Sequence, residues 1–410
     1  MESMIITGVG IIIVVLAFLQ ALLLLAGHRA RLSQAKVASQ YDLEVWDTRV
    51  QQAKITLENN RQQHANTWSG LRKFEIKRKE FENDTRSICS FYLFPHDEKP
   101  LPPFKPGQFL TFDLKVPGQE RSVVRCYSLS DAPTPDYYRV SIRQVPDGLS
   151  SSHFHQVLKE GDIVDARAPA GVFFIEPEDN SPIVMIAGGV GITPFLSMLS
   201  TIANVSPSRE AWLFYSGRTL DDFVKVKELE KIARTGRNLH VHFCVTDEPG
   251  GLPDTPNYHT CRVGVDLFEE LLPSQNYDYY MCGPRPMMVA IEDALQDWGV
   301  PKAKIHWEDF APMPAAPKKD ASGPSDLKIT FKKSDKEVQW DDSFGPLRNF
   351  AFEQGVDIPI SCGAGNCGTC LTAIREGEVE YLAEPGFPDL SEGECLPCVC
   401  IPKTNLELDA

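Results

Sequence analysis

The sequence predicts a multidomain protein with an N-terminal transmembrane helix, a β-barrel, an α/β domain and a small α+β (β-grasp) domain. Three observations lead to this class. An uncharged apolar run opens the chain, short strands give way to apolar strands that alternate with helical stretches, and closely spaced cysteines lie near the C-terminus. At 410 residues the chain is long enough for about three globular domains.

The apolar run predicts a membrane anchor. Residues 4–27 contain no charged side chain and can cross about 30 Å of hydrocarbon as one helix. A cleaved signal peptide or a buried core helix is the alternative. A signal peptide has a basic segment before a shorter apolar run, whereas Glu2 is the only charged side chain ahead of this one. The basic stretch from His28 to Lys36 predicts that the following domains face the cytoplasm, so we expect a single-pass protein held in the lipid bilayer.

Residues 28–68 are polar and lack Pro and Gly. Their apolar side chains recur at alternating intervals of three and four, which predicts a helix; they are Leu43, Trp46, Val50, Ala53 and Leu57. Two heptads are too few to define a coiled coil. We expect a helical stalk that lies on the next domain, with a dimer seam as the alternative.

Two domains of different character follow the stalk. Residues 69–177 contain short strands separated by Pro and Gly, which predicts a small β-barrel. Its clearest strands are FEIKRKEF, SICSFYLF, GQFLTFDL and YYRVSIRQV. In residues 178–310 the apolar strands PIVMIAG, AWLFYSG, LHVHFCV and YDYYMCG alternate with helix-like stretches, which predicts a parallel sheet. A Pro/Ala/Ser linker at 311–325 leads to the last domain, 326–410.

The chain is acidic, with a net charge of −15. This charge argues against binding to nucleic acid, which needs a basic face. Residues 326–410 hold 16 Asp/Glu and 7 Lys/Arg, a net −9, which indicates either docking to a basic partner or a solubilising surface. The 11 cysteines are spread over a long chain and their one dense group has metal-ligand spacing, so a reducing compartment fits better than disulfides do.

The cysteine loop SCGAGNCGTC predicts an iron-sulfur cluster. Cys362, Cys367 and Cys370 have the C-x4-C-x2-C spacing of plant-type [2Fe-2S] ferredoxins. A zinc site is the alternative, but zinc sites usually combine two short motifs that each supply two ligands, such as C-x2-4-C or H-x3-5-H. The fourth ligand comes from ECLPCVCIP, in which Cys395, Cys398 and Cys400 are candidates. Resemblance to sequences whose ligand lies in a Leu-x-Cys turn before the last strand implies Cys398, with Cys395 or Cys400 as the alternatives.

The segment Arg125-Cys126-Tyr127-Ser128 predicts a site for a flat ring that carries a phosphate. Arg125 and Tyr127 point to the same side of a strand, so one can pair with phosphate while the other packs on the ring. Ser128 can hydrogen-bond the reactive edge of that ring. Farther on, Gly148-Leu149-Ser150-Ser151 begins a helix-like run, which predicts a pyrophosphate site or, alternatively, an ordinary capped helix.

A glycine turn lies between a predicted strand and a predicted helix of the α/β domain. It reads Gly188-Gly189-Val190-Gly191-Ile192-Thr193-Pro194, a context in which glycines let the backbone approach a pyrophosphate. Cys282-Gly283-Pro284 ends another strand and begins a helix, where a sheet's carboxyl edge would meet a ligand. Cys282 is alternatively a plain buried thiol.

Taken together, PGQF, RCYSLS, GGVGITP, CGPRP and EDF occur in the order found in the ferredoxin-NADP reductase superfamily. From about Trp68 to Phe310 the chain resembles the reductase half of flavohaemoglobins. With its C-terminal domain it is similar to the NADH-dependent iron-sulfur flavoprotein reductases that supply oxygenases. The resemblance implies contacts of Tyr127 and Ser128 with the isoalloxazine and of Arg125 with the flavin phosphate.

The same resemblance extends the site. It implies a flavin contact for Phe109 and an aromatic lid at Phe310, nucleotide binding by residues 188–194, and positions beside the nicotinamide for Thr193 and residues 282–284. The choice of nucleotide depends on the residues that meet the adenosine ribose. Ser216 and Arg218 can hold a 2′-phosphate, but a nearby Asp pair would repel it. We expect NADH rather than NADPH, and FAD rather than FMN.

The expected function is electron transfer from NADH through FAD to a [2Fe-2S] cluster and on to a membrane-bound oxygenase, hydroxylase or desaturase. Such a reaction needs no catalytic acid or base. One alternative is a subunit of an NADH:quinone reductase of the sodium-pumping type, although in the similar subunit of that enzyme the cluster domain directly follows the membrane helix. The second alternative is a scaffold or sensor protein that holds the cluster without catalytic turnover.

Overall fold

The computed structural model describes residues 68, 70–119, 122–310, 327–356, 358, 363, 365, 368–382, 385, 387 and 390–410. The predicted membrane helix at 4–27, the stalk apart from Trp68, and the linker at 311–325 lie outside these residues. Within the part of the chain that is described, no helix combines the length and apolar character that crossing a bilayer requires.

The first domain is a six-stranded antiparallel barrel. Its sheet order is β4-β3-β6-β1-β2-β5, and an antiparallel bridge between Leu129 and Val140 joins the end of β4 to β5 and closes it. The elements are β1 (Arg72–Phe81), β2 (Ile88–Pro95), β3 (Phe109–Leu114), β4 (Val123–Ser128), β5 (Tyr138–Arg143), α2 (Leu149–Ser152), a π-helical turn (His153–Val157) and β6 (Ile163–Ala166). All four strands read from the sequence are confirmed.

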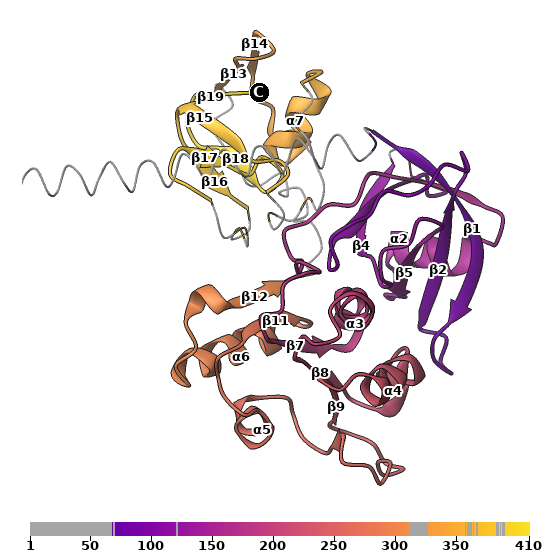
Figure 1. Ribbon diagram of the computed structural model, residues 1–410. Helices are drawn as coiled ribbons and strands as arrows, with labels where there is room; N and C mark the ends of the chain where they lie inside the picture. The colour runs from indigo at the N-terminus through magenta and orange to yellow at the C-terminus, as the bar shows by residue number, and fades with distance from the viewer. Residues whose placement is uncertain are drawn as a thin grey trace, which may run out of the picture. The chain divides into compact units, whose positions relative to one another are not determined.

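The second domain has a parallel sheet with helices on both faces (Figure 1). The strand order is β10-β9-β8-β7-β11-β12. The elements are β7 (Ile183–Gly188), a 3-10 turn (Gly189–Ile192), α3 (Thr193–Val205), β8 (Ala211–Gly217), a 3-10 turn (Leu220–Asp222), α4 (Val226–Thr235), β9 (Leu239–Val245), β10 (Tyr258–His259), α5 (Val265–Leu271), β11 (Asp278–Cys282), α6 (Arg285–Asp297), a 3-10 turn (Lys302–Lys304) and β12 (Ile305–Glu308). The parallel sheet and its four predicted strands are confirmed.

Strand β7 is apolar throughout because both of its faces are covered by helices. Ile183 and Met185 pack with α3 and α4 in one core, whereas Val184 and Ile186 pack with α5 and α6 in the other. A strand covered on both faces must be apolar at every position, as parallel strands usually are. The barrel residue Ile88 joins the first of these cores, so the two domains share apolar contacts.

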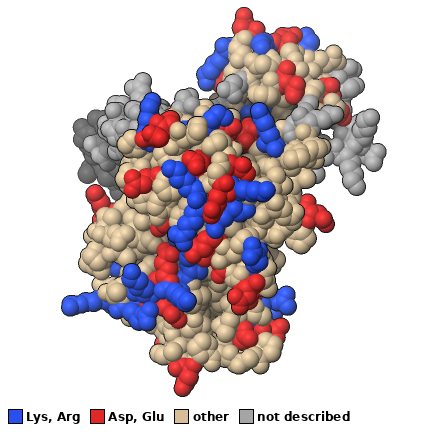
Figure 2. Space-filling model, turned by 90° about the vertical axis from the view of Figure 1, so that its right-hand side faces the viewer, with Lys and Arg blue, Asp and Glu red and all other residues tan. Residues whose placement is uncertain are grey.

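Ion pairs also cross the boundary between these two domains. Lys225, which precedes α4, lies 3.0 Å from Glu80 and 2.9 Å from Glu82 of the barrel. Arg143 at the end of β5 lies 3.8 Å from Asp222. On the face drawn in Figure 2, Lys and Arg side chains are interspersed with Asp and Glu. The boundary is therefore held by paired charges as well as by apolar packing.

The C-terminal domain has a five-stranded sheet, in the order β14-β13-β19-β15-β17, and a separate β16-β18 pair. Its core includes Phe331, Trp340, Phe350 and Leu408. The elements are β13 (Lys328–Phe331), β14 (Lys336–Gln339), a 3-10 turn (Asp342–Phe344), α7 (Leu347–Glu353), β15 (Thr372–Glu376), β16 (Val379–Tyr381), β17 (Glu394–Cys395), β18 (Cys400–Pro402) and β19 (Leu406–Leu408). One helix against a mixed sheet agrees with the predicted α+β domain.

Candidate active site

Strand β4 brings three of the predicted flavin residues together. Register pairs Ser128 with Phe109 and Tyr127 with Leu110 on β3. Alternation along the strand puts Arg125 and Tyr127 on one side and Ser128 on the other. The Tyr127 hydroxyl lies 2.9 Å from Ser150 Oγ and so connects the strand to α2. Burial raises the pKa of Tyr127, although the Ser150 hydrogen bond opposes the shift, so the phenol stays protonated.

Ser128 is the strongest structural sign of a ligand in the barrel. Its side chain is 4% exposed, and its Oγ is buried with no hydrogen-bond partner in the described protein. A buried hydroxyl left unpaired costs about 1–3 kcal/mol. A polar atom of a bound group at this place would remove that cost. The residues present therefore fit a flavin whose polar edge meets Ser128.

Phe109 occupies the neighbouring position on β3. Its side chain is buried and its ring packs on Gly171, where an added Cβ would lie 2.8 Å from the ring. Gly171 has φ +117°, a conformation that favours glycine. The ring is thus fixed beside Ser128 by the backbone of another segment. The position of Phe109 beside Ser128 is consistent with the predicted flavin contact of Phe109, which stays a prediction.

Arg125 and Cys126 are partly buried on β4. Arg125 Nη1 donates to the Val124 carbonyl at 2.7 Å, so part of its guanidinium is used within its own strand. Cys126 Sγ lies 3.3 Å from Thr111 Oγ1 on the neighbouring strand. The phosphate contact predicted for Arg125 is compatible with this geometry, whereas Cys126 has a protein partner and needs no ligand to explain its place.

The serine run after Gly148 forms a short helical turn. Gly148 caps α2 without a side-chain hydrogen bond. Ser151 Oγ instead accepts from the Val145 amide at 3.1 Å and donates to the Gly148 carbonyl at 3.3 Å. Leu149 is exposed and Ser150 faces Tyr127. The turn is therefore tied to the flavin strand through Ser150, and its role at a pyrophosphate remains a prediction.

The glycine turn of the second domain lies against the Cys282 loop. A Cβ at Gly191 would be 2.5 Å from the carbonyl carbon of Cys282 and closer still to its oxygen. A Cβ at Gly283 would be 3.0 Å from Gly188 Cα. Gly189 has φ +54°. The sequence needs glycine here because two backbones touch at the carboxyl ends of neighbouring parallel strands, the usual place for a nucleotide.

The remaining residues of the glycine turn and of the Cys282 loop are buried or bonded within the protein. Thr193 Oγ1 donates to the Val190 carbonyl at 3.1 Å, and Ile192 is fully buried. Pro194 is buried in the first turn of α3, and Pro284 precedes α6. Burial raises the pKa of Cys282 well above its ordinary value, so this thiol is a neutral wall of the site and not a nucleophile.

The residues proposed to meet the adenosine ribose are more open. Ser216 lies at the end of β8, and Arg218 is 82% exposed with its guanidinium 4.0 Å from Asp247. Asp222 accepts hydrogen bonds from the Arg218 and Thr219 amides. The carboxylates beside Arg218 would repel the 2′-phosphate that NADPH carries on its adenosine ribose. This arrangement agrees with NADH. Phe310 is 44% exposed at the end of this domain, so its lid role stays a prediction.

The predicted cluster ligands are described in part. Cys362 and Cys367 lie outside the described residues. Cys370 and Cys398 are buried with their sulfurs 3.1 Å apart, whereas the Cys400 thiol is hydrogen-bonded to Cys395, which together with burial raises its pKa. This pairing favours Cys398 as the fourth ligand.

Two glycines of the cysteine loop show why it contains small residues. Gly365 and Gly368 have φ +76° and +67°. An added Cβ would lie 2.9 Å from Val399 at Gly365 and would collide with the Phe387 ring at Gly368. At these two positions the backbone therefore packs closely on Val399, next to Cys398, and on Phe387, as glycines allow beside an iron-sulfur cluster. The residues present fit such a cluster.

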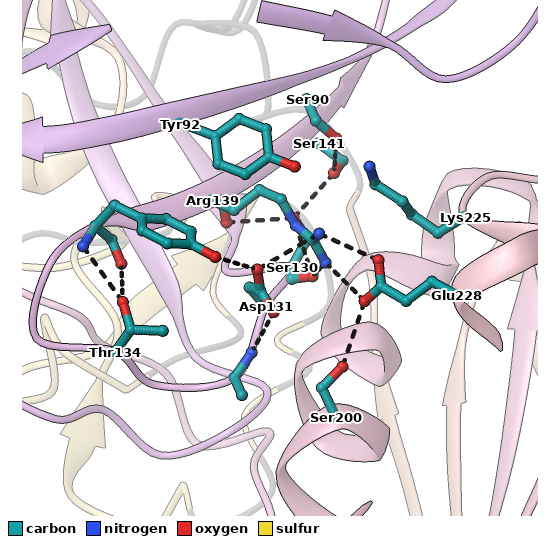
Figure 3. A network of polar contacts seen from close by, with 12 residues as sticks. Ser90, Tyr92, Ser130, Asp131, Thr134, Arg139, Ser141, Ser200, Lys225 and Glu228 are labelled. Carbon is teal, nitrogen blue, oxygen red and sulfur yellow. Dashed lines mark hydrogen bonds and ion pairs between the residues drawn. The ribbon is translucent and has the colours of Figure 1, made fainter. Parts of the chain in front are cut away.

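A buried polar network at the domain boundary could not be read from the sequence. Its centre is Arg139 on β5, which contacts Ser130, Asp131 and Glu228 (Figure 3). Arg139 occurs in a strand with no recognisable motif, and its carboxylate partner Glu228 is 89 residues away. Only the observation that a charged residue stands between the apolar residues Tyr138 and Val140 of a strand could have drawn attention to it.

Comparisons with known proteins identify two domains of the chain. Residues 185–293 match the oxidoreductase NAD-binding domain, and residues 331–403 match the 2Fe-2S iron-sulfur cluster binding domain. These matches show an NAD-binding oxidoreductase domain and a 2Fe-2S cluster-binding domain in the chain. Its reductase half is similar to flavohaemoproteins, and the matched domains support FAD, NADH and a [2Fe-2S] cluster as cofactors.

Three relatives define how far the likeness extends. The flavohaemoprotein of Halalkalibacterium halodurans is 35% identical over 254 residues, which are 60% of this chain and 61% of that protein. The flavohaem-like FAD/NAD-binding domain of a Vibrio cholerae nitric oxide dioxygenase is 29% identical with a TM-score of 0.53, over 59% of this chain and 99% of that one. Phthalate dioxygenase reductase is 25% identical with a TM-score of 0.56, over 83% of this chain and 98% of that one. The chain thus spans about three-fifths of the flavohaemoprotein.

Proposed function

We propose that this protein is a membrane-anchored NADH-dependent reductase. It passes electrons from NADH through FAD to a [2Fe-2S] cluster, and from there to a partner oxygenase, hydroxylase or desaturase. The observation that carries the proposal is the likeness to phthalate dioxygenase reductase, described as a modular structure for electron transfer from pyridine nucleotides to [2Fe-2S]. That likeness covers 83% of this chain and includes all three described domains.

The residues of the barrel and the parallel sheet would hold the two reactants in line. Bound FAD supplies the chemistry, because it accepts two electrons as a hydride and releases them singly. Gly188, Gly191 and Gly283 let the turn after β7 pack directly on the loop after β11, at the sheet edge where the nicotinamide nucleotide would bind. The unpaired hydroxyl of Ser128 would donate to the flavin, and the neutral thiol of Cys282 would add no charge beside the nicotinamide. Positioning and exclusion of water are thus the protein's contribution.

The acidic C-terminal domain supports a protein as the acceptor. Its net charge of −9 would draw a partner with a basic patch, and long-range attraction of this kind speeds weak encounters. The electron acceptor would therefore dock near the cysteine loop. A predicted membrane helix at 4–27 would keep the reductase on the same membrane as such a partner, with its domains in the cytoplasm.

Reduction of the purified chain by NADH under anaerobic conditions tests the electron route. We expect loss of the flavin absorbance, followed by the electron paramagnetic resonance signal of a reduced [2Fe-2S] cluster. Cys398→Ser should abolish that signal and the reduction of cytochrome c while leaving ferricyanide reduction by the flavin in place. Cys395→Ser removes a neighbouring buried thiol and is the matched control. If Cys395→Ser alone removes the cluster, the ligand assignment is wrong.

Fractionation of cells that express residues 1–410 or 68–410 tests the anchor. The full chain should stay with membranes after a carbonate wash, whereas the shorter chain should be released. A second measurement, NADH oxidation in membranes that lack any oxygenase, tests the proposed partner. Steady NADH oxidation with quinone as the acceptor in such membranes would favour a role as an NADH:quinone reductase subunit and would contradict the proposed partner.

A further inference from the structure

The side chain of Arg139 lies where the barrel closes on itself. Leu129 and Val140 form the closing bridge, and the Ser130 amide donates to the Arg139 carbonyl at 2.8 Å. The Arg139 side chain is 4% exposed. A charged group is thus enclosed at the point where the end of the flavin strand β4 meets β5.

The guanidinium of Arg139 contacts both domains at once. On the barrel side, Nε donates to the Ser130 carbonyl at 3.1 Å, Nη2 donates to the same oxygen, and Nη1 lies 3.4 Å from Asp131 Oδ2. Toward the nucleotide domain, Nη1 and Nη2 donate to the two carboxylate oxygens of Glu228 at 3.3 and 3.4 Å. Figure 3 shows this fork between the barrel strands and α4.

Each end of the fork is a short step from a cofactor site. Ser130 follows Ser128 by two residues, so the bonded carbonyl is on the same stretch of backbone as the hydroxyl that faces the flavin. On the other side, Ser200 Oγ donates to Glu228 Oε1 at 3.5 Å. Ser200 belongs to α3, which begins at Thr193 directly after the glycine turn. Two side chains, Arg139 and Glu228, therefore connect the segment after the flavin strand to the helix of the nicotinamide turn.

The charges make this connection stiff. Burial opposes the charged form of Arg139, but Asp131 and Glu228 outweigh it and raise its pKa, so the guanidinium keeps its charge at any working pH. A planar fork with two parallel bonds fixes direction as well as distance. Serine hydroxyls fill the space behind it: Ser130 Oγ lies 2.9 Å from Ser141 Oγ, which lies 2.7 Å from Ser90 Oγ.

We propose that Arg139 and Glu228 are positioning residues for hydride transfer, because their fork fixes the nucleotide domain against the flavin strand. This inference rests on the proposed function. The hydride leaves NADH with its electron pair and is accepted by the flavin, and this step tolerates only a short distance between the two rings. A displacement of about 1 Å can slow such a step by about 100-fold without removing any group from the reaction.

Single-turnover reduction of the full-length holoprotein tests the proposal. Flavin bleaching by NADH and by NADH deuterated at the transferred position is followed in a stopped-flow instrument for Glu228→Gln, Arg139→Lys and Ser200→Ala. We expect Glu228→Gln and Arg139→Lys to lower the reduction rate per bound flavin by about 10- to 100-fold, with a changed isotope effect and NADH affinity within about twofold. Ser200→Ala removes one long hydrogen bond and should lower the rate by about twofold to threefold.

A buried arginine elsewhere in the nucleotide domain provides the matched control. Arg209 is 2% exposed, donates to the Ser181 and Glu176 carbonyls at 2.8 and 3.2 Å, and lies 3.8 Å from Asp179. Arg209→Lys should lower thermal stability as Arg139→Lys does, yet keep the reduction rate and isotope effect of the unchanged protein. Thermal unfolding and flavin content are measured for every variant.

The outcomes separate this inference from the function on which it rests. If NADH does not reduce the flavin of the unchanged protein, the proposed function fails and the inference falls with it. If NADH reduces that flavin, but Glu228→Gln and Arg139→Lys lose stability and keep the rate and isotope effect, the fork is a structural tie and the inference is wrong. An equal slowing in Arg209→Lys would also overturn it.

Discussion

The flavin site and the nicotinamide site are built by opposite means. On β4, side chains form the candidate flavin site: the Tyr127 hydroxyl is hydrogen-bonded to Ser150, and the buried Ser128 hydroxyl has no hydrogen-bond partner in the described protein. At the nicotinamide site, the backbone forms the surface, because Gly188 and Gly191 touch the loop of β11 with no side chain between them. The flavin site therefore depends on the side chains of β4, whereas the nicotinamide site depends on the absence of side chains at its glycines.

This difference decides how each site tolerates change. A side chain on β4 can lose an atom while the strand keeps its hydrogen bonds to β3, so chemistry and fold are separable there. In the glycine turn a single methyl group meets backbone, which cannot rotate away as a side chain can. We expect substitutions at the first site to change rates and substitutions at the second to change stability and binding together.

The largest effect is expected at Gly191. In Gly191→Ala the new methyl would collide with the Cys282 carbonyl, so the turn and the β11 loop must move apart. We expect the free energy of unfolding to fall by about 1–3 kcal/mol. NADH affinity should fall by more than about tenfold, since about 1.4 kcal/mol corresponds to that factor. Denaturant unfolding and NADH titration measure the two effects.

Gly264→Ala is the matched control for this substitution. Gly264 is in the same domain with extended backbone, and an added Cβ would meet nothing within 4 Å. Its stability and NADH affinity should match those of the unchanged protein. If both alanine variants behave alike, the close approach of the two backbones is not what requires glycine at Gly191.

A smaller effect, confined to the rate, is expected at Ser128. Ser128→Ala removes a buried hydroxyl that has no protein partner, so the apoprotein should be as stable as before or more stable by about 1 kcal/mol. With FAD bound, loss of a hydrogen bond to the reactive edge should slow flavin reduction by about 10- to 100-fold. Rapid-mixing reduction with NADH and thermal unfolding of the apoprotein provide the two measurements.

Ser197 offers a comparable hydroxyl away from the flavin strand. It lies in α3, is fully buried, and its Oγ also has no hydrogen-bond partner in the described protein. Ser197→Ala should have the stability effect without the rate effect. A rate loss of the same size in Ser197→Ala, or an unchanged rate in Ser128→Ala, would contradict the assignment of Ser128 to the flavin edge.

The fold could be predicted where one physical pattern dominates the sequence. Strand β7 is apolar at every position because helices cover both of its faces, so its type and place were clear. Short strands such as β6 (Ile163–Ala166) and β12 (Ile305–Glu308) have only four residues each, too few to show a period. They are fixed by pairing with distant strands, which no local pattern records.

The site could be predicted where function constrains neighbouring residues. Tyr127 and Ser128, or Gly188 to Thr193, are contiguous and therefore leave a readable motif. The Arg139 fork leaves none, because its partners come from the segment after β4 and from α4 and meet β5 only after the barrel has closed. Among the three cysteines that stand within six positions, Cys398 could be chosen only through the resemblance, and the contact of its sulfur with Cys370 supports that choice.

The smallest effect is expected at the bond between Tyr127 and Ser150. Tyr127→Phe keeps the ring contacts with Phe112 and Phe154 and loses one hydrogen bond of 2.9 Å, worth about 0.5–1.5 kcal/mol. FAD affinity should fall by about twofold to tenfold, and Ser150→Ala should do the same. The double variant should be no worse than either single one, because both remove the same bond. FAD dissociation constants measure the coupling. Additive losses would show that each residue contacts the flavin separately, and the flavin site would then depend on direct side-chain contacts even more than its geometry indicates.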